Sequence, residues 1–222
     1  MIRRGAIALV VTMLGACSGT GGAVTTTTAP VPARAASPTE TVNRLLEALR
    51  RSDLAEAAGL VDPDQLPLVA LTEGEMPRAV AGMEPTELRT VGENFWAGFV
   101  DQFGTFLSVD VGDLRVESVV ERRAGRSDFA QVEVVLGVDA SRRSFVCRRV
   151  QSGWVLDLVA SFPSPLLVAI PGAFDAVRQS GDAELIAVMK GLEDSARYVL
   201  EDGTAVPELN QAALAAVEAI ER

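Results

Sequence analysis

Three short segments between residues 114 and 158 alternate large apolar side chains with polar ones, and a fourth strand is predicted between them at 145–150. Because successive side chains of a β-strand point to opposite faces, the alternation gives these segments one apolar face. Tight-turn signals separate the segments at 125–128, 140–142 and 152–153. Consecutive strands joined by such short turns predict an antiparallel sheet of about four strands, buried on one face.

The residues before these strands have a helical apolar period. A first helix is predicted from Ser37, which can cap it, with Pro38 at the first helical position and Glu40 completing a capping box. A second short helix follows Asp53. The proline-rich residues 62–86 read as an irregular segment with short helical pieces. Helices and an antiparallel sheet together predict the α+β fold class.

A long helix with an aromatic face is predicted from Thr86. Phenylalanines recur along it at positions 95, 99, 103 and 106. Packing in the core is the ordinary interpretation of such a stripe, and a ligand pocket lined by aromatic rings is the alternative. The candidate pocket-lining residues are Phe95, Phe99, Phe103 and, from the last predicted strand, Trp154.

Helical spacing returns after Pro163, where three helices are predicted at 165–179, 182–201 and 207–222. Helices this short are marginal alone in water, so their apolar faces are expected to pack on the sheet. Residues 161–222 are therefore expected to extend the same core. Their apolar groups are Leu166, Leu167, Val168, Ile170 and Phe174, then Leu185, Ile186, Val188, Met189 and Leu192, then Leu209, Leu214, Val217 and Ile220.

The first sixteen residues are typical of a secretory signal peptide. Two arginines precede the apolar run 5–16, which is shorter than the roughly 20 residues of a membrane span and fits the signal-peptide core of roughly 7–15 residues. The run ends in a sequence that resembles a lipobox, the motif read by lipoprotein signal peptidase. The resemblance implies cleavage after residue 16 and a lipid on Cys17; an ordinary signal peptide with a chance cysteine is the alternative. The lipobox residues are Leu14, Gly15 and Ala16.

Residues 17–36 consist mostly of Gly, Thr, Pro and Ala and cannot bury enough surface to fold. We expect a flexible tether whose ends lie roughly 25 Å apart. The domain would be exported and lipid-anchored to the outer face of the cytoplasmic membrane, or to the outer membrane of a cell that has one. The net charge of −10 argues against a nucleic-acid partner and against electrostatic docking onto anionic lipid, so the lipid anchor would make the membrane contact.

The amino-acid composition excludes several kinds of catalytic site. The chain has no histidine, which excludes Ser-His-Asp and Cys-His catalysis and histidine-based metal sites. Its cysteines are Cys17 and Cys147, so no internal disulfide is expected once Cys17 carries lipid. Asp101 and Asp157 are the carboxylates nearest a predicted interior, and both are expected to be solvated surface acids. Neither a cofactor nor a metal is predicted.

Two short helices meet at Asp53 in LLEALRRSDLAEAAGLVDPD, the long aromatic helix follows, and hairpins then close on RRVQSGWVLDL with a turn at Gly153. This order resembles the nuclear transport factor 2-like superfamily, the SnoaL-like or cystatin-like cone fold. The resemblance covers residues 37–160 and implies a curved antiparallel sheet wrapped around helices. Some relatives hold small hydrophobic ligands inside the cone, and a few are isomerases or dehydratases. Residues 161–222 extend beyond the compact pattern and could plug the cone.

Two functional hypotheses follow. The first is a non-enzymatic binding domain whose partner is another envelope protein or a small apolar ligand. The second is a cone-fold enzyme of the isomerase or dehydratase type, acting on a small hydrophobic substrate. That chemistry needs a base carboxylate facing an oxyanion donor in an apolar pocket, and the chain's one tyrosine, Tyr198, lies outside the region of resemblance. A cavity holding such a pair would favour the enzyme, and an interior filled by aromatic rings would favour binding.

The anchor hypothesis predicts that Cys17 is the site of acylation. In cells fed an alkyne-tagged fatty acid, the native protein should be labelled and Cys17→Ser should not. Cys147→Ser, which leaves the lipobox cysteine in place, is the matched control and should keep the label. Labelling that survives Cys17→Ser would contradict the anchor.

Overall fold

The computed structural model of the chain describes residues 34–107, 113–136, 141–151, 153–202 and 206–222. It confirms the predicted α+β class. The elements before the sheet are α1 (Pro38–Arg50), α2 (Leu54–Gly59), the 3-10 helix η1 (Pro63–Gln65), α3 (Leu66–Thr72), α4 (Pro77–Ala81) and α5 (Pro85–Leu107). The sheet is built from β1 (Leu114–Ala124), β2 (Ser127–Leu136), β3 (Ser141–Val150) and β4 (Gly153–Leu156). After it come α6 (Leu158–Ser161), α7 (Pro163–Ser180), α8 (Ala183–Lys190), α9 (Glu193–Glu201) and α10 (Pro207–Glu221).

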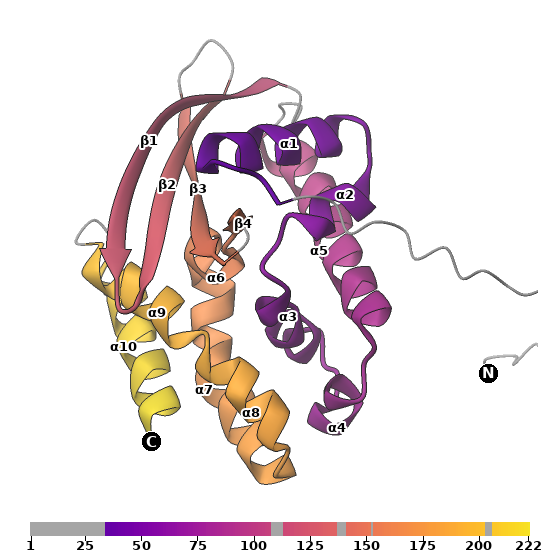
Figure 1. The fold of residues 1–222 in the computed structure, drawn as a ribbon, viewed down its shortest axis with the longest axis vertical. Coiled ribbons are helices and arrows are strands. Elements are labelled where there is room, and N and C mark those ends of the chain that lie inside the picture. The colour runs from indigo at the N-terminus through magenta and orange to yellow at the C-terminus, as the bar shows by residue number, and fades with distance from the viewer. Residues whose placement is uncertain (1–33, 108–112, 137–140, 152, 203–205) are drawn as a thin grey trace, which may run out of the picture. The chain divides into compact units, whose positions relative to one another are not determined.

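The sheet is antiparallel in the order β1-β2-β3-β4, as the alternating segments predict. Figure 1 shows β1 and β2 as long bent strands, and a register shift between Val116 and Ser118 interrupts the pairing of β1 with β2. Such an irregularity increases local twist and bends the strand. The apolar face of the sheet is buried, whereas Val119 and Val120 on β1 are exposed. The buried side chains of this face include Leu114, Val132, Val134 and Phe145, whereas Phe129 lies on the opposite face and contacts the ring of Tyr198 on α9.

Helix α1 begins at the residue that its capping signal predicts. The Ser37 hydroxyl accepts a hydrogen bond from the backbone nitrogen of Glu40, and the Glu40 carboxylate accepts one from the backbone nitrogen of Ala36. The apolar side of α1 packs against β1 and β4, and α5 packs against α2 and α3. These contacts place the long aromatic helix beside the sheet in one continuous core.

Strand β4 is bordered by segments that come before the sheet in the chain. Ala35 pairs with Trp154, whose backbone nitrogen donates to the carbonyl of Ala35 at 3.0 Å. Val61 forms a parallel bridge with Leu156. Gly153 has a φ of 140°, and a Cβ there would lie 2.5 Å from the Ala35 carbonyl oxygen. Glycine is thus required at the β3–β4 turn by both conformation and space.

The turn between β1 and β2 is tied to helix α9. Gly125 has a φ of 56°, and a Cβ on it would lie 2.2 Å from Oδ1 of Asp194. The Asp194 carboxylate accepts hydrogen bonds from the backbone nitrogen of Arg126 and from the hydroxyl of Ser127. The C-terminal helices therefore hold the end of the β1–β2 hairpin.

The last strand is shorter than predicted. The alternation of Trp154, Leu156 and Leu158 predicts a strand reaching Leu158, but β4 ends at Leu156. Asp157 instead caps α6, accepting a hydrogen bond from the backbone nitrogen of Ala160 at 2.8 Å. The prediction failed because a helix of one turn is too short to display a helical period.

The C-terminal helices share the core of the sheet, but their division differs from the prediction, and Val168, Val188, Leu209 and Leu214 are not among the core residues. The helix expected over 182–201 is divided into α8 and α9 at Gly191 and Leu192. Val168 on α7 is 68% exposed and Leu214 on α10 is 47% exposed, so neither belongs to the core. Apolar residues at helical spacing can lie beside the buried stripe without contributing to it.

Residues 1–33 lie outside the described part of the chain, and with them the predicted signal peptide, the lipobox, Cys17 and most of the tether. Within the described part, none of the helices combines the length and apolarity that crossing a bilayer requires.

A pair of variants on α7 tests the shared core. Phe174 has no exposed surface, so Phe174→Ala should lower the free energy of unfolding by about 3–5 kcal/mol. Val168→Ala on the same helix should change it by less than ~0.5 kcal/mol. Urea unfolding monitored by circular dichroism measures both. A loss below about 1 kcal/mol for Phe174→Ala would mean that α7 contributes little to the core.

Candidate functional site

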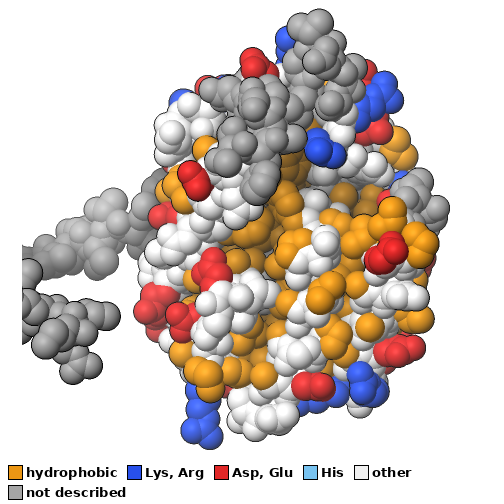
Figure 2. Space-filling model, turned by 180° about the vertical axis from the view of Figure 1, so that it is seen from behind, with side chains coloured by type: hydrophobic (Ala, Val, Ile, Leu, Met, Phe, Trp, Pro, Cys, Tyr) orange, Lys and Arg blue, Asp and Glu red, His pale blue; other side chains and the backbone are white. Residues whose placement is uncertain are grey.

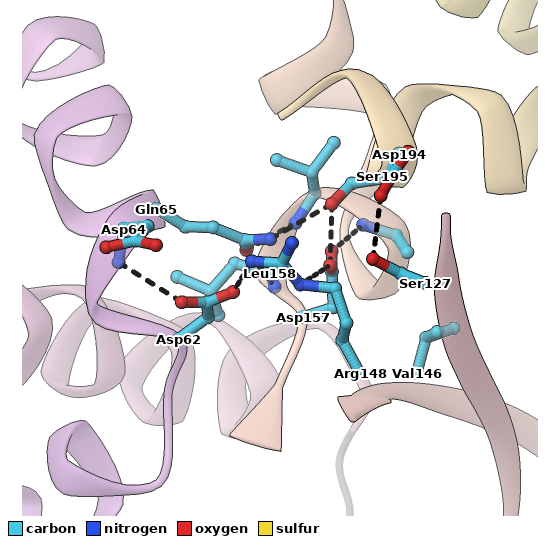
Figure 3. A network of polar contacts seen from close by, with 12 residues as sticks. Asp62, Asp64, Gln65, Ser127, Val146, Arg148, Asp157, Leu158, Asp194 and Ser195 are labelled. Carbon is cyan, nitrogen blue, oxygen red and sulfur yellow. Dashed lines mark hydrogen bonds and ion pairs between the residues drawn. The ribbon is translucent and has the colours of Figure 1, made fainter. Parts of the chain in front are cut away.

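A buried charge network joins three parts of the fold (Figure 3). The guanidinium of Arg148, on β3, forms an ion pair with the carboxylate of Asp62, just before η1. Its Nε lies 3.7 Å from Oδ2 of Asp157, at the end of β4. All three residues are buried. Burying charge is costly unless it is paired, so two carboxylates facing one arginine supply the partners that it needs.

Neutral polar side chains complete this network. The hydroxyl of Ser195, on α9, donates to Oδ2 of Asp157 at 2.6 Å. The amide of Gln65 donates to the Ser195 hydroxyl at 3.2 Å and accepts hydrogen bonds from the backbone nitrogens of Leu158 and Val159. The turn around η1, the sheet and the C-terminal helices therefore meet in one connected set of hydrogen bonds.

Both acids of the network also cap helices. Asp62 accepts a hydrogen bond from the backbone nitrogen of Asp64 at the start of η1, and Asp157 caps α6. Asx side chains before a proline or a short apolar run commonly cap helices, so the local sequence explains where each carboxylate lies. Sequence reasoning missed the network, because nothing in the sequence pairs Arg148 with two acids some 86 and 9 residues away.

Asp157 is not the surface acid that its place in the alternation predicts. It has no exposed surface. Burial raises the pKa of Asp157 above its ordinary value of 3.8, although Arg148 and the hydrogen bond from Ser195 act in the opposite direction. A substrate cannot reach a fully buried carboxylate, so we assign the network to the stability of the fold. Asp101, by contrast, is exposed on α5.

Cys147 is buried on β3 beside this network, with its sulfur 3.8 Å from the carbonyl oxygen of Pro38. Burial, with the nearby Asp157 carboxylate, raises the pKa of the thiol to about 12. A thiol in this state is a poor nucleophile at neutral pH, because the reactive form is the thiolate.

A cluster of aromatic rings forms around Phe162, at the end of α6. Its ring centroid lies 5.4 Å from that of Phe95, 5.5 Å from that of Phe99 and 6.0 Å from that of Trp96. Phe145, from β3, contacts it from the sheet side at 6.1 Å. The interplanar angles are near perpendicular, the edge-to-face arrangement that aromatic pairs prefer. We call these five rings the aromatic cluster.

An apolar cavity of about 240 Å³ lies between the aromatic cluster and the buried face of the sheet. Figure 2 shows apolar side chains gathered in a hollow on the face opposite to that seen in Figure 1. The rings of Phe99 and Phe162 that line the cavity are only half-buried, so the cavity has access to solvent. Its lining residues are Phe99, Leu114, Val134, Arg143, Ser144, Phe145, Ser161 and Phe162.

The four predicted pocket-lining residues have different positions. Phe99 lines the cavity, and Phe95 belongs to the aromatic cluster. Trp154 is buried against Ala35, with the guanidinium of Arg149 over its ring at 6.0 Å, and is not among the lining residues. Phe103 is on α5, but its side chain lies outside the described residues.

Sequence reasoning missed Phe162, which completes the cavity. Its neighbours Ser161 and Pro163 indicate a turn, and an isolated apolar residue in a turn carries no periodic signal. Only the short helix that Asp157 starts brings Phe162 back over the sheet.

Among the described residues, those that line the cavity do not include the pair of groups that isomerase chemistry needs. None of the described residues that line it is a carboxylate; its polar members are Arg143, Ser144 and Ser161. Over the described ranges, histidine, cysteine and acidic side chains nowhere form a group of three that could hold a metal ion. The cavity is therefore suited to binding an apolar group.

Comparison with known proteins gives no relative: no family model, no curated protein and no solved structure matches the chain.

The raised pKa of Asp157 gives a prediction with a definite sign. An acid whose folded-state pKa is raised favours folding most below its unfolded pKa, near 3.8, and this contribution is lost as pH rises through the folded value. Asp157→Asn removes that dependence. The unfolding free energy of the variant minus that of the native protein should therefore be more positive at pH 7 than at pH 4. Urea unfolding at both pH values measures the difference.

Asp128→Asn, which replaces a half-exposed acid of β2, is the matched control. It should shift stability by less than ~0.5 kcal/mol at either pH. If Asp157→Asn instead loses stability relative to the native protein as pH rises, attraction to Arg148 outweighs burial and the pKa of Asp157 is lowered, not raised.

Proposed function

We propose that the protein is a membrane-anchored lipoprotein of the cell envelope and that its folded domain binds a small apolar ligand without transforming it. The observation that carries the binding role is the aromatic cavity between α5 and the sheet, which has solvent access and no carboxylate among its described lining residues. Concave apolar sites with a few polar groups at one side are the usual form of small-molecule sites.

The proposed location rests on the sequence. The lipobox-like residues 14–17 follow a signal-like apolar run, and the Gly-, Thr- and Pro-rich residues up to 36 have the composition of a tether. A lipid on Cys17 would hold the domain near membranes, where apolar molecules are concentrated. A binding site for such molecules is the function that this location and the cavity jointly favour.

The energetics also suit binding of an apolar group. Each methylene transferred from water into the cavity would contribute about 0.8 kcal/mol. Rings that contact one another edge-to-face need little rearrangement to surround a ligand, which limits the entropic cost of binding. Phe99 and Phe162, the half-buried rings, are the residues whose movement would widen the cavity.

The proposal predicts that filling the cavity abolishes binding of a neutral apolar dye, N-phenyl-1-naphthylamine. Val134 lines the cavity from β2, so Val134→Phe should weaken binding by about tenfold or more, or ~1.4 kcal/mol. Phe99→Trp, at a half-buried position that tolerates a larger ring, is a second filling variant. Fluorescence titration measures the affinity, and circular dichroism checks that each variant is folded.

Val120→Phe is the matched control, because it adds the same ring to an exposed position on β1. It should leave dye affinity within about twofold of the native value, a difference of ~0.4 kcal/mol. Folded filling variants that bind the dye as tightly as the native protein would place the binding surface elsewhere.

A further inference from the structure

The apolar cavity adjoins a larger and more polar hollow. This second hollow, of about 480 Å³, lies between β3, α9 and the start of α10, and we call it the vestibule. Arg143, Ser144 and Ser161 line both the cavity and the vestibule, so the two spaces meet at these residues. A molecule that occupied both would have an apolar part among the aromatic rings and a polar part in the vestibule.

Arg143 supplies a positive charge at this junction. It is exposed on β3, and no described residue forms an ion pair with its guanidinium. Its neighbour Arg142 is bound by Glu117 at 3.1 Å. Although the chain has a net charge of −10, charges further than about 8 Å away are screened at physiological salt. Glu133, which pairs with Ser144 across β2 and β3, accepts a hydrogen bond from Ser118 and is not among the lining residues. Arg143 is therefore the charged residue among the described residues that line both spaces.

The other polar groups at the junction and in the vestibule are mostly hydrogen-bond donors. The Ser144 hydroxyl accepts a hydrogen bond from Gln131, which leaves its own proton available to a ligand. Tyr198 lines the vestibule, is 2% exposed, and its hydroxyl has no hydrogen-bond partner among the described residues. Burial raises the pKa of Tyr198 to about 12, so this hydroxyl keeps its proton at neutral pH.

The remaining polar residues there are already engaged. The Ser161 hydroxyl bonds to both the nitrogen and the carbonyl of Val146. The carboxylate of Asp202 also lines the vestibule, but it is paired with Arg122. A free cation next to unsatisfied donors matches a head group that carries negative charge and only accepts hydrogen bonds.

The size of the cavity limits the apolar part of the ligand. Its 240 Å³ is below the roughly 300–1,000 Å³ of typical drug-sized sites. This space suits a single narrow chain and excludes a lipid with two tails side by side.

We propose that the ligand is a single-chain amphiphile with an anionic head group, held with its chain in the aromatic cavity and its head group against Arg143. This inference rests on the proposed function, since it names the class of ligand for the same cavity.

The test compares three probes that share a twelve-carbon chain: dodecanoate, neutral dodecanol and dodecyltrimethylammonium. The protein carries Cys17→Ser, so that no acyl chain of its own competes, and each probe is used below its critical micelle concentration. Displacement of N-phenyl-1-naphthylamine reports binding. Dodecanoate should bind more tightly than either of the other probes, because it alone pairs its head group with Arg143.

Arg143→Gln should weaken dodecanoate by about tenfold or more, the usual effect of losing a charge-assisted hydrogen bond. It should leave dodecanol unchanged. Arg142→Gln, the matched control, should alter neither probe, because Arg142 faces Glu117 and not the cavity lining. Tyr198→Phe, which removes only the hydroxyl, should weaken dodecanoate selectively.

The outcomes separate this inference from the function on which it rests. If dodecanol binds as tightly as dodecanoate, or if Arg143→Gln leaves the affinity for dodecanoate unchanged, the proposal of an anionic head group is contradicted. The proposed apolar binding site is then still supported. If dodecyltrimethylammonium binds best, the head group has the opposite charge. If none of the probes displaces the dye, or the dye itself does not bind, both proposals fall.

Discussion

The burial of Arg148 between Asp62 and Asp157 is the interaction on which the rest of the domain depends. Each partner comes from a different part of the chain, and Ser195 adds a fourth contact from α9. Removing Arg148 or Asp62 leaves the other as an uncompensated buried charge, which costs about 3–5 kcal/mol, a large part of the stability of a typical domain. We therefore expect three parts of the chain to fold cooperatively: the helices before the sheet, the sheet, and the helices after it.

The same network determines the shape of the apolar cavity. Asp157 ends β4 and starts α6, and after one helical turn Phe162 enters the aromatic cluster. Ser161, the residue before it, is held to both backbone groups of Val146. The position of one ring over the sheet is therefore set by buried hydrogen bonds as much as by apolar packing. The buried network around Arg148 thus helps to shape the apolar cavity without contacting a ligand there.

Periodic features of the sequence were predictable, and isolated ones were not. The alternating strand segments, the cap at Ser37 and the helix that carries Phe95 and Phe99 each involve repeated or paired local signals, and the structure has them. Asp157 and Phe162 depend on a single helical turn, where a period of two and a period of 3.6 cannot be distinguished over so few residues. The contact of Arg148 with Asp62 is set by tertiary packing alone. Phe99 could be expected at a pocket, whereas nothing in the sequence distinguishes Arg143 from the other arginines of the strands.

The position of Trp96 makes its fluorescence an intrinsic reporter of the aromatic cavity. Trp96 and Trp154 are the two indoles of the chain. Trp96 has no exposed surface, its ring nitrogen has no hydrogen-bond partner among the described residues, and it contacts Phe95, Phe99 and Phe162. Trp154, on β4, instead has the guanidinium of Arg149, from β3, over its ring. Phe99 and Phe162, two of the rings around Trp96, also line the cavity. A ligand that displaces these rings changes the environment of the Trp96 indole and therefore shifts the wavelength of tryptophan fluorescence.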